Sequence, residues 1–134
     1  LESDLSKAIF SIPSVKGIEF GSGFEGSKLY GSENNDLYII KKGKIVTKTN
    51  NSGGILGGIS NGMPITIRIA FKPASSIAQK QSTVDIKTKK ITMLQVKGRH
   101  DPCVVPRAPP VVDSLVSLTL ADHALLSGAI KPVL

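Results

Sequence analysis

The residues best suited to chemistry form a short charged cluster, Gly98-Arg99-His100-Asp101-Pro102-Cys103. The guanidinium of Arg99 can bind a phosphate or a carboxylate through two parallel hydrogen bonds. The carboxylate of Asp101 can orient that guanidinium or accept a proton. The same residues are equally compatible with a simple salt bridge in a loop. The cluster therefore indicates either an anion-binding site with a proton acceptor or a local ion pair.

A second polar group follows a short strand. Residues 65–71, ITIRIAF, alternate between apolar and more polar side chains, which predicts a half-buried strand. The strand is followed by Lys72, Pro73, Ala74, Ser75 and Ser76. A lysine offers a point charge to a phosphate, and two hydroxyls can complete its coordination. An ordinary turn with an exposed lysine is the alternative reading of this segment.

Glycines are concentrated before that strand, in the pairs Gly53-Gly54 and Gly57-Gly58. Glycine lets the backbone approach a ligand closely, and several N–H groups of such a loop can point at one anion. A tight crossover between sheet layers would also need small residues. Ser60 and Asn61 add hydrogen-bonding groups that a crossover alone does not require.

Residues 21–26, GSGFEG, match the G-x-G-x-x-G pattern of dinucleotide-binding loops. The pattern binds a pyrophosphate only when a helix follows at once, because the amino end of that helix holds the ligand. The next residues, SKLYGSENND, have no helical periodicity. We therefore interpret residues 21–26 as a structural turn.

Histidine and cysteine are too scattered to indicate a metal site or a disulfide. Two histidines and one cysteine show none of the usual metal-ligand spacings, so no metal is expected. His123 is interpreted as a packing residue of the last helix. A single cysteine, Cys103, cannot form an internal disulfide, which suits a reducing compartment. No apolar run approaches the ~20 residues that span a bilayer, so no membrane partner is expected.

Positive charge is placed unevenly along the chain. Residues 1–40 carry three lysines against six acidic residues, whereas residues 41–134 carry fourteen lysines and arginines against four aspartates. A basic half indicates an anionic partner. Aromatic residues for base stacking are few, and no dense basic helix is present. We therefore expect a small anion, and no nucleic acid.

The apolar periodicity predicts one domain of the α+β class. We expect a helix over 2–11, a strand over 15–20, a hairpin over 37–48, a strand over 65–71, a hairpin over 84–96 and a helix over 111–126. The strands should be antiparallel and carry the helices on one face. The last helix is apolar on more than one face, which favours contact with another subunit or with further chain.

Several motifs together resemble a known family. The strings are SIPSVKG, GSGFEGSKLYGSENND, GGILGGISNG, KPASSI, GRHDPC and RAPPVVDSLVSLTLADHAL. They resemble the carboxyl-terminal half of chorismate synthase, and the similarity covers nearly all 134 residues. The length predicts that residues 1–134 form a single domain, and the helical periodicity of LESDLSKAIF indicates a fragment whose first residues lie within a helix. By the resemblance, this domain would be half of a β-α-β sandwich.

The resemblance also implies an activity. Chorismate synthases remove phosphate and a ring proton from 5-enolpyruvylshikimate 3-phosphate by 1,4-elimination, in the shikimate pathway to aromatic compounds. They need reduced FMN, for which NADPH is one candidate source of electrons. Members are usually homotetramers, and we expect a cytoplasmic homo-oligomer whose partner is a phosphorylated small molecule.

Carried over residue by residue, the resemblance assigns a site. The implied FMN contacts are Pro13, Ser14, Gly57, Lys72, Pro73, Ala74, Ser75, Ser76 and Arg99. Arg99 and Asp101 would also lie near the substrate. Asp101 would be the catalytic residue, because it lies near the flavin where a proton must be handled.

This sequence departs from the family pattern in two ways. Ala74 stands where the family usually has threonine, which removes one hydroxyl. The catalytic histidines and the arginine cluster of the family's first half are absent, and His100 and His123 do not correspond to those histidines. We expect the 134-residue chain alone to be inactive. The alternatives are a free-standing phosphate- or nucleotide-binding module and a basic nucleic-acid-binding domain.

Overall fold

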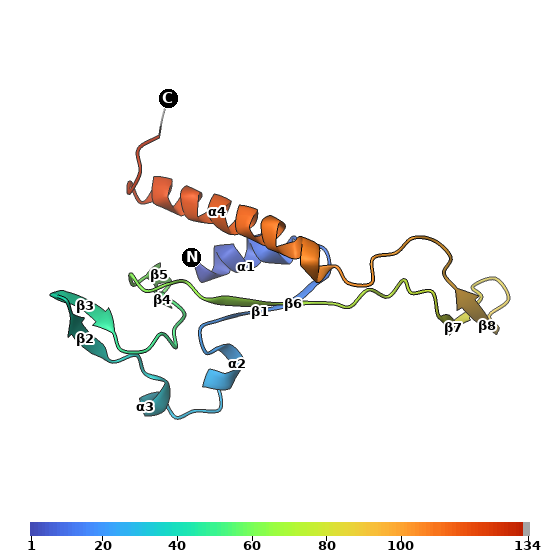
Figure 1. Cartoon of the computed structure of the whole chain (residues 1–134), viewed down its shortest axis with the longest axis horizontal. Coiled ribbons are helices and arrows are strands. Elements are labelled where there is room, and N and C mark those ends of the chain that lie inside the picture. The colour runs from blue at the N-terminus through green and yellow to red at the C-terminus, as the bar shows by residue number, and fades with distance from the viewer. Residues whose placement is uncertain (133–134) are drawn as a thin grey trace.

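The computed structural model describes residues 1–132, and its elements are labelled in Figure 1. The helices are α1 (Glu2–Phe10), α2 (Gly23–Gly26), α3 (Gly31–Asn34) and α4 (Ala108–Leu126), with a 3-10 turn η1 (Val105–Arg107) before α4. The strands are β1 (Val15–Phe20), β2 (Tyr38–Lys41), β3 (Lys44–Thr47), β4 (Ile55–Leu56), β5 (Ile59–Ser60), β6 (Ile67–Phe71), β7 (Lys80–Val84) and β8 (Ile91–Gln95). The predicted mixture of helices and antiparallel strands is confirmed. Among the described residues the strands form four separate pairs rather than one continuous sheet.

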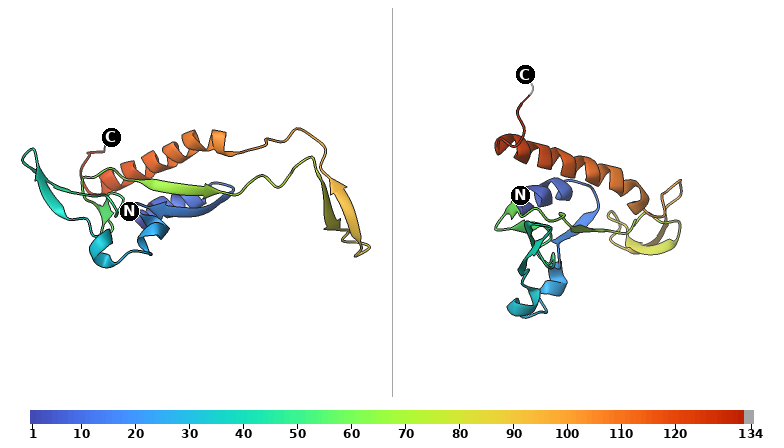
Figure 2. Two further views of the ribbon diagram at one scale, coloured as in Figure 1. Left: turned by 60° about the horizontal axis from the view of Figure 1, so that its bottom comes forward. Right: turned by 60° about the vertical axis from the view of Figure 1, so that its left-hand side comes forward.

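Helix α1 is the centre of the core. It lies between α4 and the ribbon formed by β1 and β6, so both long helices cover one face of that ribbon, as predicted (Figures 1 and 2). Leu5 and Ile9 of α1 are 0% exposed. Ile9 joins Ile12 and Val15 in one buried cluster, against which side chains of β6 and α4 pack. The core is therefore small and aliphatic.

The β1–β6 ribbon follows its predicted pattern closely. β1 occupies the predicted residues, and β6 begins two residues later than expected because Ile65 and Thr66 do not pair with β1. Ile67, Ile69 and Phe71 are half-buried on the core face, and the residues between them are exposed. The strands therefore carry one apolar face toward α1.

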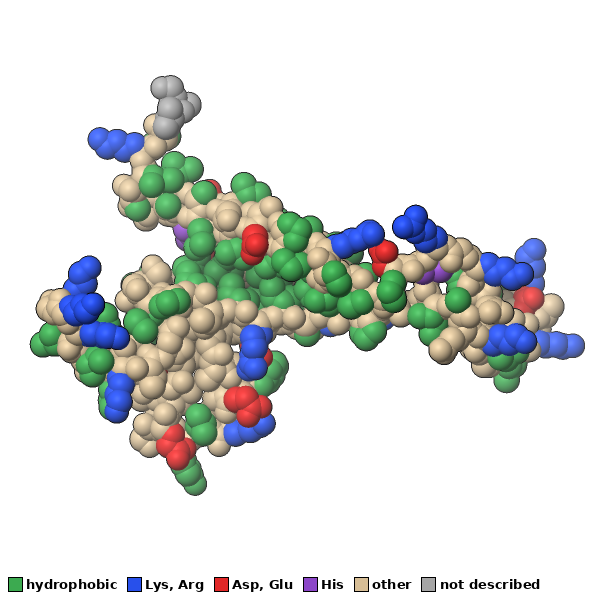
Figure 3. Space-filling view, viewed as in Figure 1, with side chains coloured by type: hydrophobic (Ala, Val, Ile, Leu, Met, Phe, Trp, Pro, Cys, Tyr) green, Lys and Arg blue, Asp and Glu red, His purple; other side chains and the backbone are tan. Residues whose placement is uncertain are grey.

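The two predicted hairpins project from opposite ends of the molecule (Figures 1 and 2). β2 pairs with β3 and β7 pairs with β8, each antiparallel. β7 begins at Lys80 rather than at Val84, because the polar run KQST pairs with TMLQ of β8. Most residues of β7 are polar and show no alternation with apolar residues, so the sequence pattern could not reveal this strand. Figure 3 shows lysine and arginine side chains gathered at both of these ends.

Helix α4 begins at Ala108, three residues before the predicted start. Pro109 and Pro110 lie in its first turn, where proline is tolerated because those N–H groups have no helical partner. Val111, Leu118 and Leu125 recur every seven residues and remain exposed on the outer side. None of the described helices is long and apolar enough to cross a lipid bilayer.

In the glycine-rich stretch, the first pair, Gly53-Gly54, is explained by the alternative that small residues are needed for close packing. A Cβ on Gly53 would lie 2.4 Å from the Gly21 backbone nitrogen, and one on Gly54 would lie 2.5 Å from the Pro64 carbonyl oxygen. Gly57 and Gly58 instead form the two-residue turn between β4 and β5, where a Cβ meets nothing within 4 Å. This small hairpin was not predicted. The first pair of glycines serves close packing and the second serves a turn with positive φ.

The G-x-G-x-x-G stretch is structural, as interpreted, although it contains the short helix α2. The sequence prediction missed α2 and α3 because four-residue helices carry no periodicity. The Phe24 backbone N–H at α2 donates to the Glu19 carboxylate, 2.9 Å away. Because this side chain accepts that hydrogen bond, the local amide is not available to a phosphate.

Asp36 binds residues 49–52, which directly precede the glycine-rich stretch. Its carboxylate accepts hydrogen bonds from the Thr49 hydroxyl and from the backbone N–H groups of Asn51 and Ser52, the latter two at 2.8 Å. Partial burial alone raises the pKa of the Asp36 carboxyl, but these hydrogen bonds outweigh it and lower the pKa below its ordinary value.

We predict that Gly53→Ala destabilises the chain far more than Gly58→Ala. Both residues have positive φ, so each substitution costs about 1–2 kcal/mol in backbone strain. The Gly53 variant also forces a methyl group into the Gly21 backbone, which should bring its total to about 3 kcal/mol or more. Urea unfolding measures both values, and equal losses would contradict the packing role.

We predict that Asp36→Asn destabilises the chain at neutral pH but not in acid. Because the folded-state pKa is depressed, this stabilisation is fully present above the unfolded-state value of about 3.9 and is lost as pH falls through the folded-state pKa. The loss at pH 7 should be about 1–3 kcal/mol, the range for hydrogen bonds to a charged group. Unfolding at pH 7 and at lower pH measures it, with Asp122→Asn as an exposed control. A difference that does not change with pH would contradict this role.

Candidate functional site

A polar cavity of about 310 Å³ lies where β6 ends. Two segments bound it, one that leaves β6 toward β7 and one that returns from β8 toward α4 (Figure 1). Its lining residues are Ser14, Lys72, Pro73, Ala74, Ser75, Ser76, His100, Asp101 and Val104. The strand-end group and the charged cluster, which are about 25 residues apart in sequence, therefore meet at one cavity.

The floor of the cavity is tied to the β1–β6 ribbon. The Lys72 backbone N–H donates to the Ser14 carbonyl oxygen at 2.7 Å. Ser14 has φ of 73°, a conformation unusual for a residue with a side chain. This turn directs the chain from α1 into β1 and leaves Ser14 exposed at the cavity. The residues just before β1 and just after β6 are thereby held side by side.

Asp101 pairs with an arginine that the sequence analysis did not select. Its two carboxylate oxygens lie 3.0 Å from Nη1 and 3.3 Å from Nη2 of Arg107. The sequence placed Arg99 beside Asp101, but Arg99 makes no ion pair within residues 1–132. Arg107 was visible only as part of the string RAPP. Nothing in the spacing of six residues indicated that a 3-10 turn would bring it back to Asp101.

The remaining predicted residues lie around or outside this cavity. Arg99 is exposed and directly precedes two lining residues. Pro13 borders a separate apolar cavity beside the start of α4. Gly57 lies in the β4–β5 turn, at the opposite end of β6, so one chain does not bring it to Lys72 (Figure 1). His100 lines the cavity although the sequence analysis gave it no role there.

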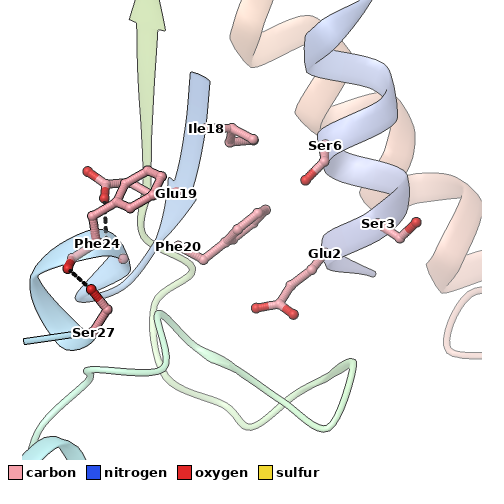
Figure 4. Close-up of a pocket in the computed structure, with 9 residues that line it drawn as sticks. Glu2, Ser3, Ser6, Ile18, Glu19, Phe20, Phe24 and Ser27 are labelled. Atoms are coloured by element: carbon pink, nitrogen blue, oxygen red, sulfur yellow. Dashed lines mark hydrogen bonds between the residues drawn. The ribbon is translucent and has the colours of Figure 1, made fainter. Parts of the chain in front are cut away.

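A larger cavity of about 460 Å³ between α1, β1 and α2 is chemically unlike the first (Figure 4). Phe20 and Phe24 line one side of it, and Glu2 of α1 lies on the other side. Its lining includes two glutamates and no lysine or arginine. It would repel an anion, so its greater size does not make it the better site for a phosphate.

Helix α4 carries the second histidine on its inner side. His123 is half-buried, and its Nε2 lies 2.9 Å from the Asp4 carboxylate of α1. This hydrogen bond lowers the pKa of the Asp4 carboxyl. Within residues 1–132, no three His, Cys, Asp or Glu side chains gather in a way that could hold a metal ion. Cys103 is exposed with a free thiol.

Comparison with known proteins gives one consistent family. The model of the chorismate synthase family matches residues 1–125. Chorismate synthases of Methanosarcina barkeri and Dehalococcoides mccartyi are 56% and 54% identical over 98% and 100% of this chain. The chain spans only 36% and 37% of those relatives.

A solved structure agrees with this result. A crystal structure of chorismate synthase superposes with a TM-score of 0.70 and 30% identity, covering 94% of this chain and 30% of that one. The matched region contains both segments that bound the polar cavity. By sequence and by fold, the chain belongs to the chorismate synthase family.

Proposed function

We propose that this chain supplies part of the flavin and substrate site of a chorismate synthase. The enzyme would remove phosphate and a ring proton from 5-enolpyruvylshikimate 3-phosphate, with reduced FMN bound. The observation that carries the proposal is the convergence of Lys72–Ser76 with His100 and Asp101 on one cavity. That cavity lies in a chain that the family model matches over residues 1–125.

The donor groups of the cavity fit the phosphate end of FMN. Lys72, Ser14, Ser75 and Ser76 are among the residues that line the cavity, and together they offer one ammonium group and three hydroxyls. Charge-assisted hydrogen bonds from such donors to phosphate oxygens are roughly twice as strong as neutral ones. Ala74, which replaces a threonine of the family pattern, contributes a methyl group instead of a further donor.

When bound, reduced FMN would supply an electron-rich ring beside the substrate, although the elimination itself causes no net oxidation or reduction. The chain's own residues would bind and orient the reacting groups. Arg99 makes no ion pair within residues 1–132, so its guanidinium could bind an anionic group of the flavin or the substrate. NADPH is one candidate source of the flavin's electrons.

Asp101 is the proposed proton-handling residue. Its carboxylate lines the cavity and is oriented by Arg107 at 3.0 Å. In a 1,4-elimination the ring C–H electrons form a new double bond, the existing ring double bond shifts by one position, and the C–O bond to phosphate breaks with its electrons leaving on the phosphate. The proton must pass to a base and the phosphate must be stabilised as it leaves. The Asp101 carboxylate suits the first task, and the guanidinium of Arg99, two residues away in sequence, suits the second.

The intact enzyme is proposed to be a cytoplasmic homo-oligomer. Large apolar side chains remain exposed on both hairpins and on the outer side of α4, including Tyr38, Met93 and Leu118. Such surfaces are typical of regions that contact other chain or other subunits. A tetramer would follow the usual assembly of the family. Gly57, which is distant from Lys72 in one chain, could complete a flavin site only by packing against another subunit or further chain.

A free-standing phosphate- or nucleotide-binding module is the second candidate. The polar cavity alone would support it, because a lysine and several hydroxyls bind many phosphorylated ligands. A basic nucleic-acid-binding domain is less well supported, since the lysines gather at two separate hairpins rather than along one groove (Figure 3). Binding of oligonucleotides with a steep salt dependence, and none of FMN, would favour that class.

We predict that Lys72→Gln weakens FMN binding. The host is a chimera in which this chain replaces the matching part of the Methanosarcina barkeri relative. Loss of a charged hydrogen bond of about 1.5–3 kcal/mol should raise the Kd by about 10- to 100-fold, as measured by flavin fluorescence. Lys44→Gln, at the start of β3 and far from the cavity, is the matched control. Equal effects of both substitutions, or a folded chimera that binds no FMN, would contradict the proposal.

We predict that the 134-residue chain by itself produces no chorismate. The histidines and arginines that the family uses in its first half do not occur within these residues. An assay of phosphate release from 5-enolpyruvylshikimate 3-phosphate with photoreduced FMN measures this directly, and the chimera serves as the active control. Turnover by the isolated chain would show that the residues described above suffice for catalysis.

A further inference from the structure

We propose that Arg107 is a positioning residue that holds the loop of residues 97–104, called here the Asp101 loop, against the cavity. The inference rests on the proposed function, because it concerns how the proton-handling carboxylate is placed. Arg107 does not line the cavity itself. It would act through Asp101, with which it shares two contacts of 3.0 and 3.3 Å.

The geometry of this pair is that of a fork. Nη1 faces Oδ2 and Nη2 faces Oδ1, so each nitrogen is paired with a different carboxylate oxygen. A bidentate contact fixes direction as well as distance, which a lysine ammonium could not do. The pair therefore determines which way the Asp101 side chain points.

Arg107 makes every polar link that the Asp101 loop has within the described residues. The side-chain hydrogen bonds of residues 97–104 are limited to the pair of Asp101 with Arg107. Outside helices and strands, the backbone hydrogen bonds of these residues are limited to the one that Arg107 N–H donates to the Val104 carbonyl at 3.1 Å. Without the Arg107 side chain, the loop would keep only that local backbone hydrogen bond, chain connectivity and weak packing.

The backbone of Arg107 is held by regular structure, whereas the Asp101 loop has none. It ends η1 and precedes α4, next to the buried Ala108. Pro106 and Pro109 fix φ on both sides of it. Helix α4 packs against α1 in the core. The Arg107 guanidinium therefore holds the Asp101 loop, which has no regular structure of its own, in a fixed position relative to the core.

The pair also keeps two arginines in different roles. Asp101 is two residues from Arg99 and could pair with it if Arg107 were absent. Such a pair would neutralise the guanidinium that is proposed to bind an anionic group. By occupying Asp101, Arg107 leaves Arg99 unpaired within residues 1–132. Loss of Arg107 should therefore disturb both the carboxylate and the anion contact.

The effect should appear in position rather than in stability. The side chains of Arg107 and Asp101 are 77% and 44% exposed, and an exposed ion pair contributes little to folding. The test compares Arg107→Gln with Arg68→Gln. Arg68 is a matched control, because it is similarly exposed and pairs with Glu19 at 2.7 Å away from this cavity.

The first readout needs no catalysis. In the 134-residue chain, the backbone order parameters S² from ¹⁵N relaxation should be about 0.85 for the Asp101 loop, as in rigid backbone. In Arg107→Gln they should fall below about 0.6. Arg68→Gln should leave the loop unchanged, and Arg107→Lys should restore only part of the order. A loop that is equally ordered in wild type and Arg107→Gln would overturn the proposal. So would a loop that is equally mobile in both.

The second readout uses the chimera with the Methanosarcina barkeri relative. Arg107→Gln should lower kcat by about 10- to 100-fold, the cost of misplacing a catalytic group by about 1 Å. In an Asp101→Asn background it should have almost no further effect, because it acts through Asp101. If Arg107→Gln lowered kcat by the same factor in the wild-type and Asp101→Asn backgrounds, the positioning role would be overturned. If Asp101→Asn alone kept full activity, the proposed function of Asp101 would fail, while the relaxation result would still decide whether Arg107 orders the loop.

Discussion

The packing of α1 between α4 and the β1–β6 ribbon is the constraint on which the rest of the structure depends. Leu5 and Ile9 are completely buried at this contact, although the core around them is small. The contact fixes the end of β6 relative to the start of α4. Lys72 follows directly after β6, and Arg107 directly precedes α4. Both sides of the polar cavity are thus anchored in the same three-layer core.

From this frame, the chemistry depends on two irregular segments. Lys72–Ser76 leaves the ribbon with its first backbone N–H bonded to Ser14 at 2.7 Å. The Asp101 loop returns to α4 and is fixed through Arg107. Regular structure supplies rigidity, and the segments between elements supply donors and a carboxylate. The division is usual for sites that must approach a ligand closely.

The sequence predicted the parts of the fold whose side chains alternate or repeat. The strand over 15–20, the apolar face of 67–71 and the first helix follow from burial, which leaves a periodic pattern. β7 could not be predicted in this way, because its residues are exposed and show no apolar periodicity. The helices α2 and α3 could not be predicted either, because four residues are too few to show a helical period. For the site, proximity in sequence suggested Arg99 as the partner of Asp101. The partner is Arg107, which a 3-10 turn brings back across six residues.

The most direct measurement is a crystal structure of the chimera with FMN bound. We expect the flavin phosphate within about 3 Å of the Lys72 ammonium or of the hydroxyls of Ser75 and Ser76, with Asp101 still paired to Arg107. A flavin bound instead in the larger cavity beside Phe20 and Phe24, with no ligand near Lys72, would contradict it.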